Sequence, residues 1–384
     1  MKTTLLIDAK NDAVHAALLE DGVAVEYHVA LPGEGALYRA RVKTVESKIN
    51  AAFLDIGDGE EAFLSLRDAR ALKPKSKSIS EAVAEGDLIL VKLKAAPAED
   101  GKLATATANP MMAGRYALTG HLPGQAFLSR RLQANDELQA LAEEFEDGKS
   151  LIIRTNAEAV AVAAVRAEIE ALQTVWNQAG TEGETGVVVE ALTPLEKILR
   201  DYAPHDVAEI LMNDRIAHKQ AQKMAGDKWP DLDGKITLFD EDTPIMDAFG
   251  VTDKIDAAKD GKAHLPSGGT IIIEGTAGMT VIDVNTGHAR KGGSPETLYI
   301  ATNLEAAKAI AAELRFQNLG GLITVDFIDM KSRGDREKVG AVLDKSFAQD
   351  TMPVERTNIN RFGILSIRRK RRGMALRDAL EGRT

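Results

Sequence analysis

The chain of 384 residues is 44% hydrophobic and 28% charged, which is typical of a globular protein and predicts about two to four compact units. It contains no cysteine, which excludes disulfides and thiolate metal sites, and its net charge of −10 argues against a protein that coats nucleic acid non-specifically. No apolar run reaches the roughly 20 residues that cross a bilayer, and the strand-like start is unlike a signal peptide, so we expect a cytoplasmic protein without a membrane partner.

The first hundred residues read as short strands separated by turn signals. Residues 3–9 and 23–30 are β-like runs that cannot bury their faces alone. From Gly35 to Ala108 the pattern changes to short strands of even spacing. This pattern predicts a small barrel such as the OB-fold, a common binder of single-stranded nucleic acid. The expected strands are 36–46, 51–56, 61–66, 88–93 and 104–107.

Residues 109–192 predict a mixture of strands and helices. Thr155 and Glu158 have the spacing of a capping box before an alanine-rich helix, which places Arg154 and Thr155 at a helix N-terminus. Backbone N–H groups and the helix dipole favour an anion at such a position. An ordinary helix cap beside a surface arginine explains the same spacing. The expected elements are strands near 115–120, 125–128 and 151–155, and helices at 135–146 and 158–178.

Residues 193–262 give fewer signals. Thr193 and Pro194 open a helix by the same capping logic, whereas residues 227–262 are rich in turns and indicate no chemistry. The seven histidines of the chain are scattered without metal-ligand spacing, so we expect packing or surface roles for them.

Residues 263–330 contain the clearest pattern in the chain. The runs 270–276 and 279–285 are rich in β-branched residues and flank Ala277-Gly278, which predicts a hairpin. A helix follows, with Ser294 as its expected cap and Gly320 at its end, and then a third strand at 322–328. Since a strand, a helix and a strand joined in this way give parallel neighbours, the second and third strands should end at the same edge of one sheet.

This edge carries two carboxylates, Asp283 and Asp326. Asn285 lies two residues after Asp283 and therefore on the same face of its strand. Two carboxylates so close would raise each other's pKa unless a cation lay between them, and Mg²⁺ suits hard oxygen ligands, with Mn²⁺ as a substitute. The sequence therefore predicts a metal site. The alternative is that each aspartate ends a strand and caps the following loop.

Several motifs of this region, in order, closely resemble the catalytic region of the ribonuclease E/G family. They are Leu265–Gly269, Ile282–Thr286, Thr302–Ala307, Asn318–Ile323, Val325–Met330 and Asn360–Gly363. The resemblance implies an α/β and β chain of several subdomains. These are an RNase H-like subdomain in two parts, 1–34 and 193–262, an OB-fold at 35–108, a 5′-sensor subdomain at 109–192, and a DNase I-like catalytic subdomain at 263–384.

The resemblance also implies roles for single residues. Phe53 and Phe63 match aromatic side chains that stack on RNA bases, and Lys102 falls where a lysine contacts phosphate. Composition alone favours both phenylalanines as barrel core. Asp283, Asp326 and Asn285 would be catalytic, the two aspartates would bind the metal, and Arg361 would contact RNA. A pocket for a 5′-monophosphate would contain Arg154, Thr155, Leu118 and Arg130.

The expected activity is Mg²⁺-dependent cleavage of single-stranded RNA, which leaves a 5′-phosphate and a 3′-hydroxyl, in the processing of ribosomal or transfer RNA or in messenger decay. Stimulation by a 5′-monophosphate is also expected. Because the chain lacks the family's cysteine zinc link, we expect no zinc, and a monomer or weak homodimer. The alternatives are a non-catalytic RNA-binding or ribosome-assembly factor and, in a further class, a DNA nuclease.

Overall fold

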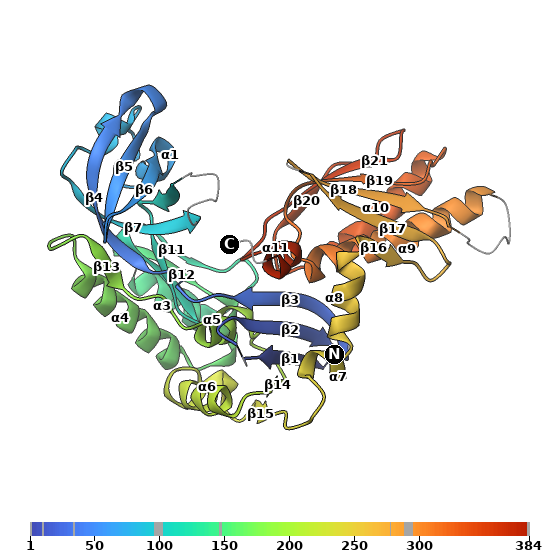
Figure 1. Cartoon of the computed structure of the whole chain (residues 1–384), viewed down its shortest axis with the longest axis horizontal. Helices are drawn as coiled ribbons and strands as arrows, with labels where there is room; N and C mark the ends of the chain where they lie inside the picture. The colour runs from blue at the N-terminus through green and yellow to red at the C-terminus, as the bar shows by residue number, and fades with distance from the viewer. Residues whose placement is uncertain are drawn as a thin grey trace. The chain divides into compact units, whose positions relative to one another are not determined.

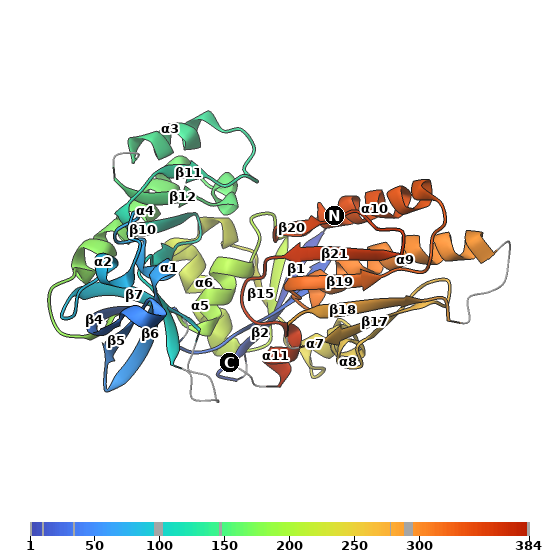
Figure 2. The ribbon, with the colours of Figure 1, turned by 90° about the horizontal axis from the view of Figure 1, so that it is seen from above.

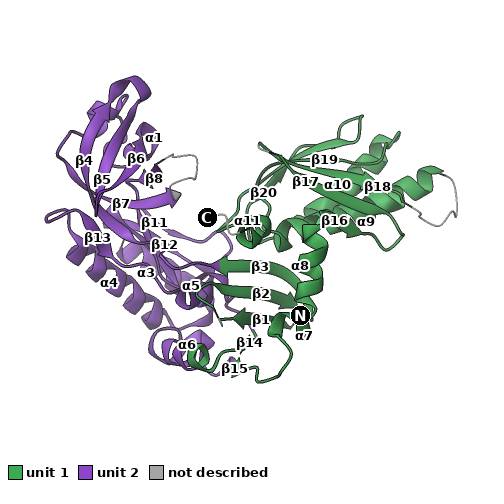
Figure 3. Cartoon of the chain, viewed as in Figure 1, with its two compact units in different colours: residues 1–29, 208–218, 237–384 green, residues 30–207, 219–236 purple. Residues whose placement is uncertain are grey.

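The computed structural model describes residues 2–9, 11–33, 35–95, 103–145, 148–276, 278–287 and 295–381. The chain divides into two compact units, shown in Figure 3. Unit 1 comprises residues 1–29, 208–218 and 237–384, and unit 2 comprises residues 30–207 and 219–236. None of the helices described is long and apolar enough to cross a membrane.

One sheet of five strands joins the N-terminus to a segment some two hundred positions later (Figure 1). Its central strand β1 pairs in antiparallel fashion with β2 and in parallel with β14. The two β-like runs near the N-terminus thus find a partner from far along the chain, as expected. The order is β15 (Ile236–Leu238), β14 (Glu209–Met212), β1 (Thr3–Asp8), β2 (Val14–Glu20) and β3 (Val23–Ala30).

The second sheet of unit 1 has six strands, with α9 (Pro295–Phe316) and α10 (Arg333–Phe347) beside it (Figure 2). Both helices contribute apolar side chains, such as Ile310 and Leu343, to one core with the strands. The predicted hairpin and the parallel pair joined by a helix are confirmed, while Ala277 and Ser294 lie outside the described residues. The order is β16 (Lys262–His264), β17 (Thr270–Gly275), β18 (Thr280–Asn285), β19 (Gly321–Asp326), β21 (Ile364–Arg369) and β20 (Val354–Arg356).

Unit 2 contains a closed barrel of five strands, because β4 pairs with both β5 and β7. Alternate residues such as Leu54, Leu64 and Val91 fill its core. The mixed α/β class and a barrel consistent with the OB-fold are therefore confirmed. The sequence missed a further strand, β13 (Gly186–Val189), which adds to β4. The barrel strands are β4 (Leu37–Glu46), β5 (Ala51–Gly57), β6 (Glu60–Ser65), β8 (Ala104–Thr107) and β7 (Leu88–Ala95).

Unit 2 also holds a four-stranded sheet with α3 (Asp136–Glu144) and α4 (Val162–Ala179). The prediction that a helix starts at Glu158 was wrong. Residues Thr155–Ala159 form a short 3₁₀ turn, Val160 is extended, and α4 begins at Val162. The capping box fails because the Glu158 carboxylate accepts the N–H of Gln133 instead. The order is β11 (Ala126–Leu128), β12 (Lys149–Ile153), β10 (Ala117–Pro123) and β9 (Met111–Ala113).

The remaining elements connect these sheets. The hydroxyl of Thr193 accepts the N–H of Glu196 (3.2 Å) and caps α5 as predicted. Helices in the weakly patterned stretch after residue 214 were not predicted. The remaining bounds are α1 (Leu66–Ala69), α2 (Ile79–Ala82), α5 (Pro194–Tyr202), α6 (Arg215–Lys228), α7 (Ile245–Ala248), α8 (Val251–Lys259) and α11 (Leu376–Leu380), with 3₁₀ turns at Ser47–Ile49 and Pro230–Leu232.

Candidate active site

Two carboxylates lie side by side where β18 and β19 end. Asp283 and Asp326 are direct partners in the parallel register of these strands. Both are exposed, whereas their strand neighbours Ile282, Val284 and Val325 are buried in the core. Since successive side chains of a strand point to opposite faces, the two carboxylates stand on the open face, away from the core. The juxtaposition expected from the sequence is therefore present.

The surroundings of this pair favour a bound cation. The side-chain amide of Asn285 donates to Oδ2 of Asp283 (2.7 Å), which fixes that carboxylate. Partial burial and the negative charges of Asp283 and Asp329 raise the pKa of Asp326 above its usual range. Within the described ranges, neither Asp283 nor Asp326 forms an ion pair with lysine or arginine. Among the residues that the structure describes, the site thus concentrates negative charge without an ion-paired lysine or arginine.

The oxygen atoms available at this edge suit Mg²⁺ or Mn²⁺. Two carboxylates, with waters completing the shell, are a common way to hold Mg²⁺, which keeps several of its waters. The described residues contain no cluster of three or more His, Cys, Asp or Glu side chains arranged to hold a metal ion. A metal here would therefore rely on Asp283 and Asp326 together with water or substrate oxygens.

Buried hydrogen bonds hold the segment that follows Asp326. Asn303 of α9 is fully buried, and its amide group donates to the carbonyl of Ile328 (2.8 Å) and accepts its N–H (3.1 Å). Glu305, one half-turn later, accepts the N–H of Ser267 (2.9 Å). The helix thereby fixes two loops, one at Ser267 and one at Ile328. These contacts give a physical role to a motif that the sequence identified only by resemblance.

A tight turn at Asn360–Gly363 lies against the end of β19. The Asn360 side chain accepts the N–H groups of Phe362 (2.8 Å) and Ile364 (3.1 Å), and the Phe327 N–H donates to the Gly363 carbonyl (3.2 Å). Gly363 has a φ of +80°, and a Cβ there would clash with the Phe327 carbonyl, so only glycine fits. The turn thus holds the Gly363 backbone close to Asp326, and Arg361 and Phe362 precede Gly363 in the same turn.

On the barrel, Phe53 and Phe63 are paired outside the core. They are direct cross-strand partners of β5 and β6, with ring centroids 6.0 Å apart and planes at 72°. Both are half-buried and alternate with the buried core residues Leu54 and Leu64. The interpretation that both phenylalanines fill the barrel core is therefore wrong, because their rings are accessible from outside the barrel. Lys102, expected nearby, lies outside the described residues.

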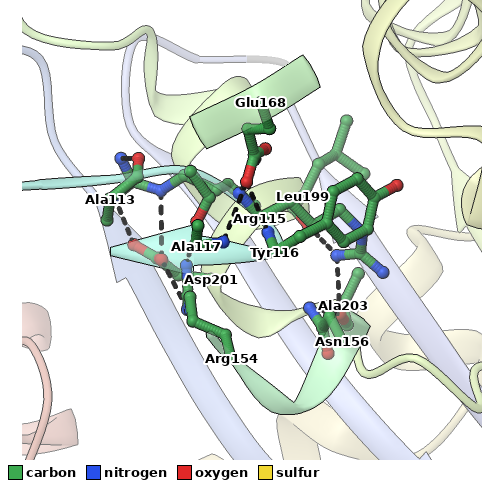
Figure 4. Close-up of polar contacts among 12 residues, drawn as sticks. Ala113, Arg115, Tyr116, Ala117, Arg154, Asn156, Glu168, Leu199, Asp201 and Ala203 are labelled. Carbon is green, nitrogen blue, oxygen red and sulfur yellow. Dashed lines mark hydrogen bonds and ion pairs between the residues drawn. The ribbon is translucent and has the colours of Figure 1, made fainter. Parts of the chain in front are cut away.

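The residues of the expected 5′-phosphate pocket meet at one end of the four-stranded sheet. Leu118 is half-buried on β10 and pairs with Ile152, and Arg130 is exposed in the turn after β11. The hydroxyl of Thr155 lies 3.2 Å from that of Ser129 in the same turn. The Arg154 guanidinium donates to the carbonyl of Gly114. It also donates to Asp201 (3.1 Å; both residues are labelled in Figure 4). Arg154 is thus already bound to protein groups.

A buried ion pair anchors the start of β10. Arg115 and Asp231 have side chains 0% and 1% exposed, and the Arg115 guanidinium donates to both Asp231 oxygens. It also donates to the carbonyls of Leu199 (2.8 Å) and Ala203 (2.9 Å). The Glu168 carboxylate accepts three successive backbone N–H groups, those of residues 115–117 (Figure 4). Every charged group here has a partner, which is the arrangement that a structural role requires.

Comparison with known proteins decides the family. A model described as "Ribonuclease E/G family" matches residues 111–372. A ribonuclease G from Haemophilus influenzae is 31% identical over 98% of this chain and 81% of its own length. The chain belongs to the ribonuclease E/G family. Further relatives from Escherichia coli are a ribonuclease G, 28% identical over 80% of its length, and a ribonuclease E, 29% identical, of which this chain spans 37%.

Membership of the ribonuclease E/G family confirms the resemblance found in the sequence, and with it the expected class of enzyme, a ribonuclease. The structure adds residues to which the sequence gave no individual role: Asn303, Asn360 and Phe362. Their motifs were visible, but a buried amide that holds a loop, or an exposed ring in a turn packed against another strand, becomes apparent only once distant segments have been placed together.

Proposed function

We propose that this protein is an endoribonuclease that hydrolyses single-stranded RNA at the edge formed by Asp283 and Asp326, with Mg²⁺ as its metal. The observation that carries the proposal is the register of β18 and β19, which sets these carboxylates side by side without a balancing cation among the described residues. A non-catalytic RNA-binding protein would not need this unfavourable arrangement.

Each residue of the edge has a proposed task. Asp283 and Asp326 hold the metal, and Asn285 keeps the Asp283 carboxylate oriented through its hydrogen bond. When bound, Mg²⁺ lowers the pKa of a water molecule and neutralises charge on the scissile phosphate. Arg361 contacts a phosphate oxygen of the strand. Attack by water with departure of the 3′ oxygen leaves a 5′-phosphate and a 3′-hydroxyl.

The barrel supplies the preference for single strands. Phe53 and Phe63 offer ring surfaces outside the core, on which unpaired bases can stack. Stacking contributes about 1–3 kcal/mol per base and tolerates different sequences. Lys102 would contact phosphate beside them. Bases in a duplex are already stacked and paired, so a duplex should bind more weakly than a single strand.

The architecture supports a division into the subdomains of the family. We assign the sheet of β1–β3, β14 and β15 to an RNase H-like subdomain, residues 1–34 and 193–262, and the barrel to an OB-fold at 35–108. The sheet of β9–β12 would form a 5′-sensor subdomain at 109–192. The six-stranded sheet with α9 and α10 would form the DNase I-like catalytic subdomain at 263–384.

A 5′-monophosphate should stimulate cleavage through Arg154, Thr155, Leu118 and Arg130. The phosphate would share the Arg154 guanidinium with Asp201, which holds it at 3.1 Å, while exposed Arg130 adds a second positive charge. Because the phosphate must compete with the Asp201 carboxylate for Arg154, we expect only a weak stimulation. The cleavage rate should rise about tenfold, near the lower end of what charge-assisted hydrogen bonds provide.

The test is cleavage of matched single-stranded RNA and DNA oligonucleotides, with Mg²⁺, Mn²⁺ or EDTA, followed by mapping of the new ends. We expect RNA to be cut with either metal, EDTA to stop the reaction, and the product to carry a 5′-phosphate. Tight RNA binding without turnover under any metal would contradict the proposal and favour the RNA-binding or ribosome-assembly factor. Light scattering, with and without zinc, tests the expected monomer or weak homodimer.

A further inference from the structure

Phe362 is an exposed aromatic side chain at the carboxylate edge that the activity described so far does not use. Its side chain is 61% exposed, although phenylalanine is a large apolar residue. Single exposed apolar residues are common and carry no argument by themselves. Three features of Phe362 together point to a ligand: its position in a turn against β19, its rigid backbone and its contact with Arg361.

The backbone that carries Phe362 is held on both sides. The Phe362 N–H donates to the Asn360 side chain (2.8 Å), and the Gly363 N–H donates to the Asn360 carbonyl (3.2 Å). Gly363 is in turn bound by the N–H of Phe327, the residue that follows Asp326. Exposure of the ring is therefore built into a fixed turn and does not result from a loose loop.

The same contacts set this turn next to the reacting groups. A Cβ placed on Gly363 would lie 3.8 Å from Oδ1 of Asp326. Phe362 therefore directly precedes a residue whose backbone lies close to the Asp326 carboxylate. An RNA strand whose phosphate lies at the carboxylate edge would bring its flanking nucleotides toward this turn.

Arg361 completes the surface. Its guanidinium carbon lies 4.6 Å from the centroid of the Phe362 ring, a cation–π contact that covers one part of the ring and restrains its orientation. Arginine contacts phosphate, and an aromatic ring stacks with a base. Two adjacent residues therefore present the groups that recognise the two halves of one nucleotide.

We propose that Phe362 forms a nucleobase-binding subsite, in which its ring stacks on an unpaired base next to the scissile phosphate while Arg361 contacts a phosphate of the same nucleotide. The inference rests on the proposed function and deepens it. It adds a requirement for an unpaired base at the cleavage position itself, in addition to the bases held by the barrel. Because every base has a π-face, the subsite tolerates all four bases.

The experiment combines variants of the full chain with abasic substrates. Rates are measured as kcat/KM on an oligonucleotide with one cleavage site, intact or with one abasic nucleotide at successive positions around that site. Phe362→Ala should lower kcat/KM about 5- to 100-fold, the range of base stacking on an aromatic ring. Phe362→Tyr and Phe362→Trp should stay within about threefold of the natural protein, and Phe362→Leu, which keeps apolar bulk but no π-face, should resemble Phe362→Ala.

One abasic position should reproduce the loss in the natural protein and cause no further loss in Phe362→Ala, because both changes remove the same contact. Leu322→Ala is a matched control: Leu322 is 46% exposed on β19, at the end opposite to Asp326, and its loss should leave the rate unchanged. Unchanged melting temperatures exclude misfolding. Additive losses at every abasic position, or an unchanged rate in Phe362→Ala, would overturn the proposal.

A binding assay separates this proposal from the proposed function. The probe is a single-stranded oligonucleotide with 2-aminopurine at successive positions, whose fluorescence falls when the base stacks on an aromatic ring. At the position next to the scissile phosphate, we expect quenching with the natural protein and with Asp326→Asn, and none with Phe362→Ala, whereas quenching by the barrel at other positions should be the same in all three proteins. Quenching without cleavage by the natural protein would contradict the proposed function alone. Cleavage with equal quenching for Phe362→Ala would contradict the subsite alone.

Discussion

Two groups of charged residues, one in each unit, have opposite surroundings. In unit 2, Arg115 and Asp231 are completely buried, and each is matched by a charge of opposite sign and by further hydrogen bonds. In unit 1, Asp283 and Asp326 are exposed, lie beside each other, and have no lysine or arginine partner among the described residues. A buried pair that is fully satisfied fixes a conformation, whereas adjacent like charges are unfavourable unless a cation, such as a metal ion, lies between them.

This difference separates structural from functional charges by their partners and not by residue type. Both groups contain aspartates: Asp231 in the buried pair, and Asp283 and Asp326 in the exposed pair. What distinguishes them is whether the surrounding protein balances the charge. Substitutions that break one or the other arrangement should therefore have opposite effects on stability and on activity.

The largest effect should come from neutralising one carboxylate of the exposed pair. Asp326→Asn or Asp283→Asn should lower the cleavage rate by at least about 10³-fold, because charge stabilisation at the scissile phosphate is lost. Without Mg²⁺ the melting temperature should stay the same or rise, since one of two like charges is removed. Single-turnover cleavage measures the rate, and thermal unfolding measures the melting temperature. Asp329→Asn, which removes a neighbouring charge outside the strand, is the control and should keep most activity.

The buried pair should respond in the reverse manner. Asp231→Asn leaves the Arg115 guanidinium buried without its counter-charge, so the free energy of unfolding of unit 2 should fall by about 3–5 kcal/mol. Urea unfolding measures this loss. Under conditions where the variant is folded, its rate of cleavage per folded molecule should remain close to that of the natural protein. A stable but inactive variant would show that this pair serves catalysis and that the comparison is wrong.

A second paired cluster, in unit 1, predicts a dependence on pH. Burial alone would raise the pKa of Glu26, but the hydrogen bond with His28 and the charge of Arg315 outweigh it and bring the pKa to about 2. Because this value lies below the ordinary value of 4.5, the stabilisation is present above about pH 4.5 and is lost as the pH falls toward 2.

Glu26→Gln should therefore reduce the free energy of unfolding by about 2–3 kcal/mol at pH 7, and the difference from the natural protein should shrink between pH 4.5 and pH 3. Denaturant unfolding of both proteins between pH 7 and pH 3 measures this difference in the free energy of unfolding. Glu20→Gln, which removes the more exposed partner of the same arginine, should have a smaller effect. A difference that stays constant down to pH 3 would contradict the assigned pairing.

Arg154 is the intermediate case, with a side chain 17% exposed and paired with Asp201. If Arg154 also binds a terminal phosphate, the natural protein should cut RNA with a 5′-monophosphate about tenfold faster than RNA with a 5′-hydroxyl. Arg154→Lys should reduce this preference, because lysine lacks the planar guanidinium group that donates two parallel hydrogen bonds. Initial rates on the two matched oligonucleotides decide it. Equal rates in the natural protein would place Arg154 with the structural charges of Arg115 and Asp231.

Local patterns in the sequence were sufficient for the barrel and for the carboxylate pair. The pair follows from a crossover rule: two strands joined by a helix run parallel, so Asp283 and Asp326 had to end at one edge. Thr155 and Glu158, in contrast, had the spacing of a cap, yet Glu158 binds a loop residue 25 positions earlier and the helix starts later. The partner of Arg154 lies 47 residues away and that of Arg115 lies 116 away. Such contacts leave no periodic signal.

The most direct test of the central claim is binding of Mn²⁺, a paramagnetic substitute for Mg²⁺, followed by electron paramagnetic resonance in the absence of RNA. We predict saturable binding by the natural protein and by Asp329→Asn, and its loss in both Asp283→Asn and Asp326→Asn, with all four proteins folded. Mn²⁺ binding that is unchanged in Asp283→Asn and Asp326→Asn would contradict the claim that the exposed pair is the metal site.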